Sequence, residues 1–238
     1  MTALVTGASG GIGEELARLF AADGHDLVLV AREVGRQHAR DEAPREIFEG
    51  LSAGGVAVDA LVNNAGFGSY GLFAETDLKS ELDLLQVNVV ALTHLTKLFL
   101  PGMIARRRGY VMNVASTAAF QPGPLMAVYY ASKAYVLSFS EALANECEGT
   151  GVVVSALCPG PTETGFVAAA PGMNESKLFD RAVMDARAVA VEGYRGLLAG
   201  KAIVIPGLRN NLLARSIGFF PRGLVTRVVR GIQERRNH

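Results

Sequence analysis

The sequence predicts one α/β domain built around a doubly wound parallel sheet. Its 238 residues suit a single domain of this class, because such folds often run past about 200 residues without dividing. Half of the residues are hydrophobic and 19% are charged, which supports a sizeable buried core. Short β-branched runs alternate with longer helical patterns, as expected when helices cover both faces of a parallel sheet. No repeat or linker interrupts this alternation, so residues 1–238 are interpreted as one domain.

The expected strands are nearly continuous hydrophobic runs, which is typical of strands covered on both faces. They are residues 2–6, 26–31, 58–63, 110–115, 152–158 and 202–206. Helical patterns fill the gaps between them, at residues 12–22, 43–53, 78–105, 126–147 and 185–199.

One stretch is too short for the simplest version of this fold. Only 26 residues separate Arg32 from Asp59, where helix, strand and helix are the usual order. Two helices of about 11 residues, a strand of about 5 and three loops need roughly 39. With residues 43–53 forming one helix, residues 33–42 are too few for a further helix and strand. We therefore expect that one edge strand and its helix are absent, which leaves the second strand at the sheet edge; seven parallel strands would contradict this.

Composition and charge exclude several classes of protein. The 23 basic and 23 acidic residues cancel, so no nucleic-acid partner is expected. Cys147 and Cys158 lie on apolar stretches and are interpreted as buried free thiols of a reducing compartment. No secretory leader, metal site or uninterrupted apolar run of about 18 residues is expected. The prediction is a soluble cytoplasmic protein.

A glycine-rich segment, "TGASGGIG" (6–13), follows the first strand and opens a helix. Glycines there let the backbone turn tightly and approach a pyrophosphate at the helix N-terminus, although an ordinary tight turn is the alternative. The G-x3-G-x-G spacing resembles that of the short-chain dehydrogenase/reductase family, which implies a Rossmann-like fold and a nicotinamide dinucleotide cofactor. The resemblance implies cofactor contacts at Gly7, Ser9, Gly11, Ile12 and Gly13.

The end of the second strand, "LVLVAR", bears on the choice of cofactor. An acidic residue there would hold the ribose 2′-hydroxyl of NAD, but Ala31 stands in its place and Arg32 follows. A guanidinium without a competing carboxylate suits a 2′-phosphate, so NADP(H) is favoured over NAD(H). The alternative is an ordinary surface arginine after a strand. Glu33, which directly follows Arg32, is a carboxylate and counts against a phosphate site here.

Three tyrosines surround a lysine in "VYYASKAYV" (128–136), but only Tyr129 precedes Lys133 by four residues. On a helix this spacing places both side chains on one face, whereas Tyr130 and Tyr135 have Ala134 and Phe139 at that spacing. A phenol with a pKa of about 10 needs a lower pKa to exchange protons near neutral pH, and a close lysine cation acts in that direction. Tyr129 is the predicted general acid/base.

The surrounding segment "VMNVASTAAFQPGPLMAVYYASK" also resembles the active-site segment of this family. Ser116, 13 residues before Tyr129, is expected to stabilise the substrate oxygen, although a serine that only caps a turn is the alternative. Asn88 in "LLQVNVVA" matches the asparagine that interrupts a helix in the family and anchors a water leading to the lysine. The resemblance thus implies a tetrad of Asn88, Ser116, Tyr129 and Lys133.

Two further segments match the family. "LVNNAG" (61–66) implies contacts with the adenosine ribose, and "CPGPTETGF" (158–166) implies contacts with the nicotinamide amide and the phosphates. The residues concerned are Asn64, Ala65, Gly66, Pro159, Gly160, Thr162 and Thr164. The acidic residue that normally lies beside the adenine is not clearly replaced, and Asp41 is a candidate by position alone.

The substrate side is expected to be apolar or aromatic, because residues 66–71 and 120–125, with Tyr130 and Phe166, match where the family builds its substrate wall. Core packing is the equal alternative. The tail from residue 210 mixes apolar residues with arginines. It is interpreted either as an interfacial helix that touches an anionic membrane or extends the substrate pocket, or, preferably, as an amphipathic helix packed on the domain. By resemblance, the chain is expected to form a homodimer or homotetramer through the long helices carrying Asn88 and Tyr129.

The predicted function is an NADP(H)-dependent oxidoreductase acting on the carbonyl or secondary alcohol of a small, apolar substrate. Two alternatives remain open: a dinucleotide-binding protein without catalysis, and a variant whose shortened nucleotide lobe binds cofactor poorly. The first alternative would typically have lost Ser116, Tyr129 or Lys133, and all three are present.

Overall fold

The computed structural model describes residues 1–31, 41–166, 173 and 183–234. In these residues six parallel strands form one sheet in the order β2-β1-β3-β4-β5-β6. The strands are β1 (Thr2–Thr6), β2 (Asp26–Val30), β3 (Val58–Asn63), β4 (Gly109–Val114), β5 (Val152–Leu157) and β6 (Ile203–Val204). The order reverses direction after β1, which opens a crevice at the carboxyl ends of β1 and β3.

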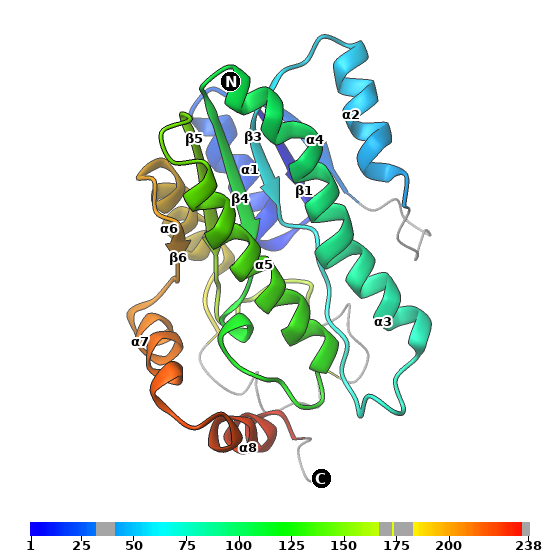
Figure 1. The fold of residues 1–238 in the computed structure, drawn as a ribbon, viewed down its shortest axis with the longest axis vertical. Helices are drawn as coiled ribbons and strands as arrows, with labels where there is room; N and C mark the ends of the chain where they lie inside the picture. Colours follow the sequence, from blue (N-terminus) through cyan, green and yellow to red (C-terminus); the bar gives the residue numbers. More distant parts are fainter. Residues whose placement is uncertain (32–40, 167–172, 174–182, 235–238) are drawn as a thin grey trace.

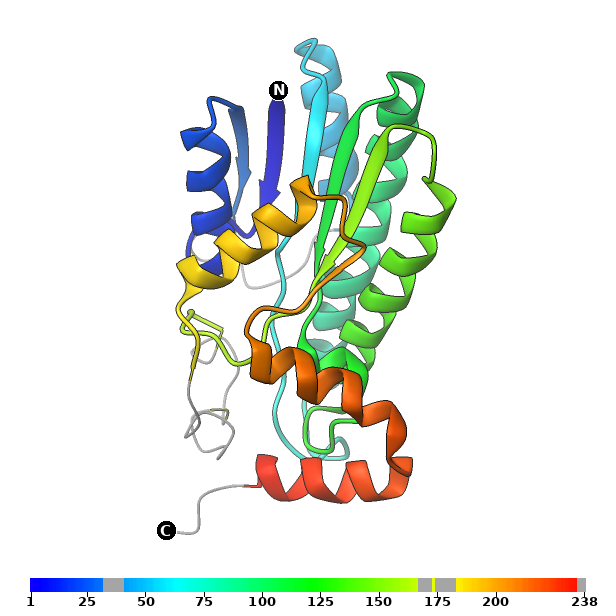
Figure 2. The ribbon, with the colours of Figure 1, turned by 90° about the vertical axis from the view of Figure 1, so that its left-hand side faces the viewer.

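Helices cover both faces of the sheet (Figures 1 and 2). They are α1 (Gly11–Ala22), α2 (Ala43–Ala53), α3 (Leu78–Leu85), α4 (Leu92–Ala105), α5 (Ala127–Glu146), α6 (Ala186–Leu198), α7 (Leu208–Ser216) and α8 (Arg222–Gln233). Helices α1 and α6 pack together on one face, and α2, α4 and α5 lie on the other. The α/β class and the parallel, doubly wound sheet are therefore confirmed.

Strand β2 lies at the edge of the sheet, as the short spacing between Arg32 and Asp59 predicted. Its side chains are only partly covered, and Leu29 is 55% exposed. The predicted loss of a strand and helix concerns residues 33–42, of which 33–40 lie outside the described residues. In the described part the chain proceeds from β2 to α2 and then to β3, beside β1.

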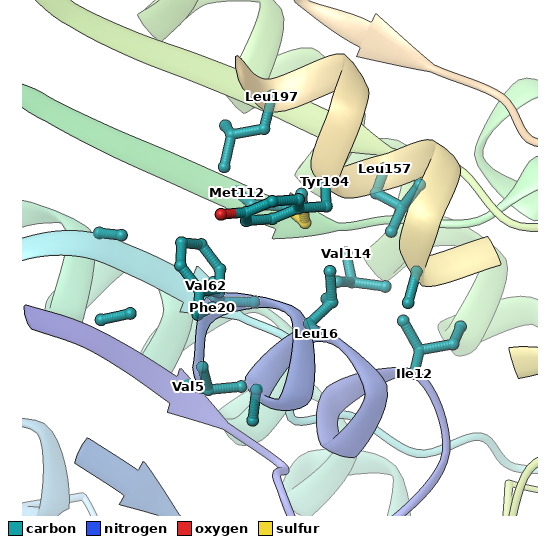
Figure 3. Close-up of a cluster of buried hydrophobic side chains, with 14 of the residues drawn as sticks. Val5, Ile12, Leu16, Phe20, Val62, Met112, Val114, Leu157, Tyr194 and Leu197 are labelled. Carbon is teal, nitrogen blue, oxygen red and sulfur yellow. The ribbon is translucent and has the colours of Figure 1, made fainter. Parts of the chain in front are cut away.

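The core between the sheet and helices α1 and α6 explains why these elements stack (Figure 3). Leu16 and Phe20 recur on one face of α1 and are fully buried against the inner residues of β1, β3 and β4. The Phe20 ring meets Tyr194 of α6 edge-on, with 4.8 Å between ring centroids. The Tyr194 hydroxyl donates to Asp23 at 2.6 Å, so this buried phenol keeps a polar partner.

Residues 78–105 were expected to form one helix, and they form α3 and α4 joined by a π-helical turn, η1 (Gln86–Ala91). This stretch is long and apolar enough to cross a membrane by length and composition alone. Core helices of globular domains have the same traits, and here α4 packs on β3, β4 and α2. The π-turn widens the helix at Asn88, where the family resemblance implied an interruption.

After β6 the chain leaves the sheet in a C-terminal arm, which we define as residues 208–233. It comprises α7, a short 3-10 turn (Ile217–Phe219) and α8. Figures 1 and 2 show α8 at the end of the molecule opposite the N-terminus, below the carboxyl ends of the strands. The arm therefore lies at the end of the sheet where the crevice opens.

Candidate active site

The glycine-rich loop between β1 and α1 has the backbone geometry of an anion cradle. Gly7 and Gly11 have φ values of 67° and 57°, a region that strains other residues. A Cβ on Gly11 would lie 2.8 Å from the Thr164 side chain, so the loop approaches the opposite wall closely. No side chain caps the N-terminus of α1, which leaves its first N–H groups and the positive end of the helix dipole for a ligand. These features fit the pyrophosphate of a dinucleotide.

Asn64 and Thr6 hold this loop from behind. The Asn64 amide donates to the carbonyl oxygens of Thr6 and Gly7 at 3.0 and 3.1 Å, and the backbone N–H groups of Asn64 and Ala65 donate to the Thr6 hydroxyl. Gly13 is not among the residues that line the cleft, so its implied ligand contact stays a prediction. A Cβ there would lie 2.3 Å from both the Asn64 amide and the Gly7 carbonyl oxygen, so Gly13 lets α1 pack on the loop.

A cleft of about 690 Å³ runs from the β2 edge past this loop to Tyr129. The volume lies within the range of ligand sites, about 300–1,000 Å³. Predicted residues along it are Gly7, Ser9, Gly11, Ile12, Asn64, Ala65, Gly66, Ser116, Tyr129, Lys133, Pro159, Gly160, Thr162 and Thr164. Arg32 lies outside the described residues, so its proposed contact with a 2′-phosphate stays a prediction.

Sequence reasoning missed the wall at the β2 end of the cleft. Pro44, Glu46 and Ile47 of α2 line it together with Ala31 and Leu95. Asp41, the residue considered for the adenine, is exposed and is not part of the lining. No residue type in α2 signals a binding role, since these side chains reach the cleft only because α2 packs against α4, where Phe48 meets Phe99 edge-on.

Tyr129 and Lys133 lie on one face of α5, as their spacing predicted, and both are buried. The Lys133 ammonium lies 5.9 Å from the Tyr129 ring centroid and donates to the Val114 carbonyl oxygen at 2.8 Å. Ser116 follows β4, and its hydroxyl accepts from the Ala118 N–H at 3.1 Å at the start of a 3-10 turn. Ser116 therefore caps a turn and also lies within hydrogen-bonding reach of Tyr129.

Burial shifts the pKa values of both Tyr129 and Lys133. It raises the pKa of Tyr129 to about 12, and the hydrogen bond with Ser116 offsets this only in part. It lowers the pKa of Lys133 to about 8, and the nearby Cys158 thiol acts in the opposite direction. Desolvation of the phenolate is the largest cause of the raised Tyr129 pKa, and the lowering by Lys133 stays a prediction.

Asn88 is buried in the π-turn and links three segments of the site. Its amide donates to the Phe67 carbonyl oxygen at 3.0 Å and to the Ser132 hydroxyl at 3.1 Å, and its carbonyl accepts from the Phe67 N–H. Gly66 lies against this group: a Cβ there would be 2.9 Å from the Asn88 carbonyl oxygen and 3.4 Å from the Lys133 ammonium. The tetrad implied by the resemblance is therefore assembled in one place, with Asn88 behind the cleft wall.

The substrate side of Tyr129 is apolar. The Phe166 ring lies 5.2 Å from the Tyr129 ring, and Met173 is fully buried beside it. Both expected loops contribute, because Phe67, Tyr70 and Leu125 pack in the same cluster. Tyr130 lies in this cluster and its hydroxyl accepts from the Gln233 amide of α8, while the Tyr70 hydroxyl donates to the Gln233 carbonyl oxygen. Tyr130 is thus tied to the C-terminal arm.

The comparisons with known proteins agree with this geometry. A family model described as short chain dehydrogenase matches residues 1–54 and 39–174. The two matches overlap at residues 39–54, in the shortened stretch between Arg32 and Asp59.

A Streptomyces virginiae protein named as the ketoacyl reductase assigned to the monensin polyketide synthase is 40% identical over 188 residues, 68% of this chain and 70% of that protein. A very-long-chain 3-oxoacyl-CoA reductase from Pyrenophora tritici-repentis is 34% identical over 183 residues, 64% of this chain. The match spans about half of that relative, 52% of its length.

A solved short-chain dehydrogenase from Sphingobium yanoikuyae, in complex with NADPH, superposes with a TM-score of 0.79 over 94% of both chains at 26% identity. The glycine loop, the tyrosine and lysine on α5 and these matches lead to one assignment. The chain belongs to the short-chain dehydrogenase/reductase family, and it is an NAD(P)(H)-binding oxidoreductase of carbonyl or alcohol groups.

Proposed function

We propose that this protein is an NADP(H)-dependent reductase of a ketone on an apolar, acyl-like substrate. The observation that carries the proposal is the apolar cluster around Tyr129, in which Phe67 and Phe166 line the cleft beside a buried phenol. The two reported reductases of oxoacyl compounds support the substrate class by similarity.

The chain's own residues account for the proton chemistry. With its pKa raised to about 12, Tyr129 holds its proton at neutral pH, which is the form that donates to a carbonyl oxygen as it gains negative charge. Ser116 provides a second hydroxyl at the same oxygen. The nicotinamide, when bound, supplies the hydride. Lys133 places a cation beneath the phenol, and Asn88 holds the Phe67 backbone and the Ser132 hydroxyl that surround it.

The preference for NADP(H) rests on the end of β2. Ala31 lines the cleft where a carboxylate would repel a 2′-phosphate, and Arg32 follows in the sequence. Glu46 of α2 also lines this end, so the wall is not uniformly basic. A fluorescence titration with NADPH and NADH tests this preference directly; tighter binding of NADH would contradict it, and binding of neither would favour a defective nucleotide lobe.

Paired tyrosine variants test the catalytic assignment. Tyr129→Phe removes the proton donor and should lower ketone-dependent oxidation of NADPH by at least about 100-fold, the usual contribution of a general acid, with little change in NADPH binding. Tyr130→Phe removes only the hydroxyl that is bonded to Gln233 and should retain most activity. The reverse pattern would refute the assignment. We further propose that the enzyme acts in the cytoplasm as a homo-oligomer.

A further inference from the structure

The C-terminal arm exposes an apolar face that the domain leaves uncovered. On α8, Val225, Val229 and Gln233 turn toward the domain, and Val229 and Gln233 are buried. Leu224 and Val228, four residues apart on the adjoining side of α8, are 44% and 53% exposed. Phe219 and Phe220 in the preceding turn are 87% and 54% exposed. We define the docking face as Phe219, Phe220, Leu224 and Val228.

Basic residues accompany this face. Residues 208–234 contain five arginines and a single carboxylate, Glu234, in a chain whose 23 basic and 23 acidic residues cancel. Arg230 pairs with Glu234 at 3.5 Å. Within the described part of the chain, the other four arginines make no ion pair, and those on α8, Arg222 and Arg227, are exposed. The positive charge is thus concentrated on the arm.

We propose that the docking face binds the surface of an anionic lipid bilayer. Exposed Phe, Leu and Val side chains can enter the acyl boundary while arginines meet the lipid phosphates, which is how amphipathic helices lie in a membrane interface. A second copy of the chain fits this face less well, because pairing two arms would bring two sets of unpaired arginines together.

The domain-facing side of α8 connects this surface with the active site. Val225 and Val229 pack in the same cluster as Tyr129 and Phe166, and Gln233 bonds to Tyr130, the neighbour of Tyr129 in the sequence. A bilayer on the docking face would therefore lie one helix away from the apolar substrate side. An apolar substrate dissolved in the bilayer would be concentrated next to the site.

Co-sedimentation with vesicles tests this proposal on the full chain. We expect the protein to pellet with phosphatidylcholine vesicles that contain phosphatidylserine and to remain in solution with phosphatidylcholine alone. Phe219→Ser and Leu224→Ser should weaken the binding, whereas Leu198→Ser, at the far end of α6, should not. Arg227→Gln should lower the partition coefficient by about fivefold, the contribution of one arginine near an anionic surface, and Arg195→Gln should not.

Activity on a water-soluble ketone without vesicles should be unchanged in these variants, which separates membrane binding from the catalytic assignment. Failure of the wild-type chain to pellet with either vesicle overturns the proposal. Equal binding by Arg227→Gln and the wild type also overturns it. A fall in oligomer mass caused by Phe219→Ser, without vesicle binding, assigns the face to a second copy instead.

Discussion

At the scale of single residues, burial decides the protonation states of the site. Lys133 is enclosed by α5, β4 and the Gly66 segment, and its ammonium has the Val114 carbonyl oxygen as a partner. Burial disfavours its charged form, just as burial disfavours the phenolate of Tyr129. Tyr129 is therefore a neutral phenol at neutral pH, and the neighbouring Lys133 is mostly protonated only below pH 8.

This burial predicts a pH-dependent difference in stability between the wild type and Lys133→Met. The lysine pKa is about 8 in the folded state against an ordinary value of 10.5, so between these pH values the unfolded chain binds more protons. The free energy of unfolding of the wild type relative to the variant should therefore rise with pH, by up to about 3 kcal/mol. Denaturant unfolding across this range measures the difference. Parallel curves for the two proteins would contradict a depressed lysine pKa.

At the scale of elements, three additions to the sheet complete the site. The π-turn places Asn88 against Phe67 and Ser132, helix α2 supplies the wall at the β2 end of the cleft, and α8 covers the cluster around Tyr130. Each depends on packing between segments that are distant in the sequence. The interruption at Asn88 had a sequence signal, an asparagine in an otherwise apolar helix, and the mixed tail predicted an amphipathic helix packed on the domain, but nothing in the sequence indicated the role of α2.

Gln233 is expected to hold α8 on the domain. Gln233→Ala removes the bond to the Tyr130 hydroxyl and leaves a cavity next to Val229, so α8 should lose about 1–3 kcal/mol of local stability. Hydrogen exchange should become faster in the α8 amides while the sheet amides keep their protection. Arg227→Ala, on the exposed side of the same helix, is the matched control and should leave α8 unchanged. Equal exchange in all three proteins would show that α8 is held by other contacts.

At the scale of the whole molecule, the outer faces of the η1 turn and of α5 carry exposed apolar side chains that bear on assembly. Val90 and Tyr135 are 47% and 39% exposed there, and the Tyr135 ring stacks on Phe139 with 5.6 Å between centroids. These exposed apolar side chains lie on the long helices through which family resemblance predicts a dimer. They lie on different elements from the docking face of the C-terminal arm.

Light scattering should therefore give a mass of at least two chains for the wild type. Val90→Glu places a charge in the expected interface, where burial without a partner is costly, and should shift the mass toward that of one chain. Leu198→Glu changes an exposed leucine of α6 and should keep the wild-type mass. A monomeric wild type would refute the predicted dimer.

Much of the fold followed from local pattern. Continuous hydrophobic runs identified all six strands of the described residues, and residues 43–53 form a helix with the predicted bounds, because period and strand length are local properties. The missing length after Arg32 correctly placed β2 at the sheet edge. The motif position of Gly13 does not reveal that this residue packs against Asn64, and its ligand contact stays a prediction.

The sequence by itself determined the parallel α/β fold, the family and the selection of Tyr129 among three tyrosines, because helical spacing and motif spacing are encoded along the chain. Tertiary structure alone decided which neighbours desolvate Tyr129 and Lys133, that α2 lines the cleft, and that Tyr130 is bonded to Gln233, 103 residues away. The physical reason is that burial and hydrogen bonding depend on distances between segments, and these are established only when the segments pack.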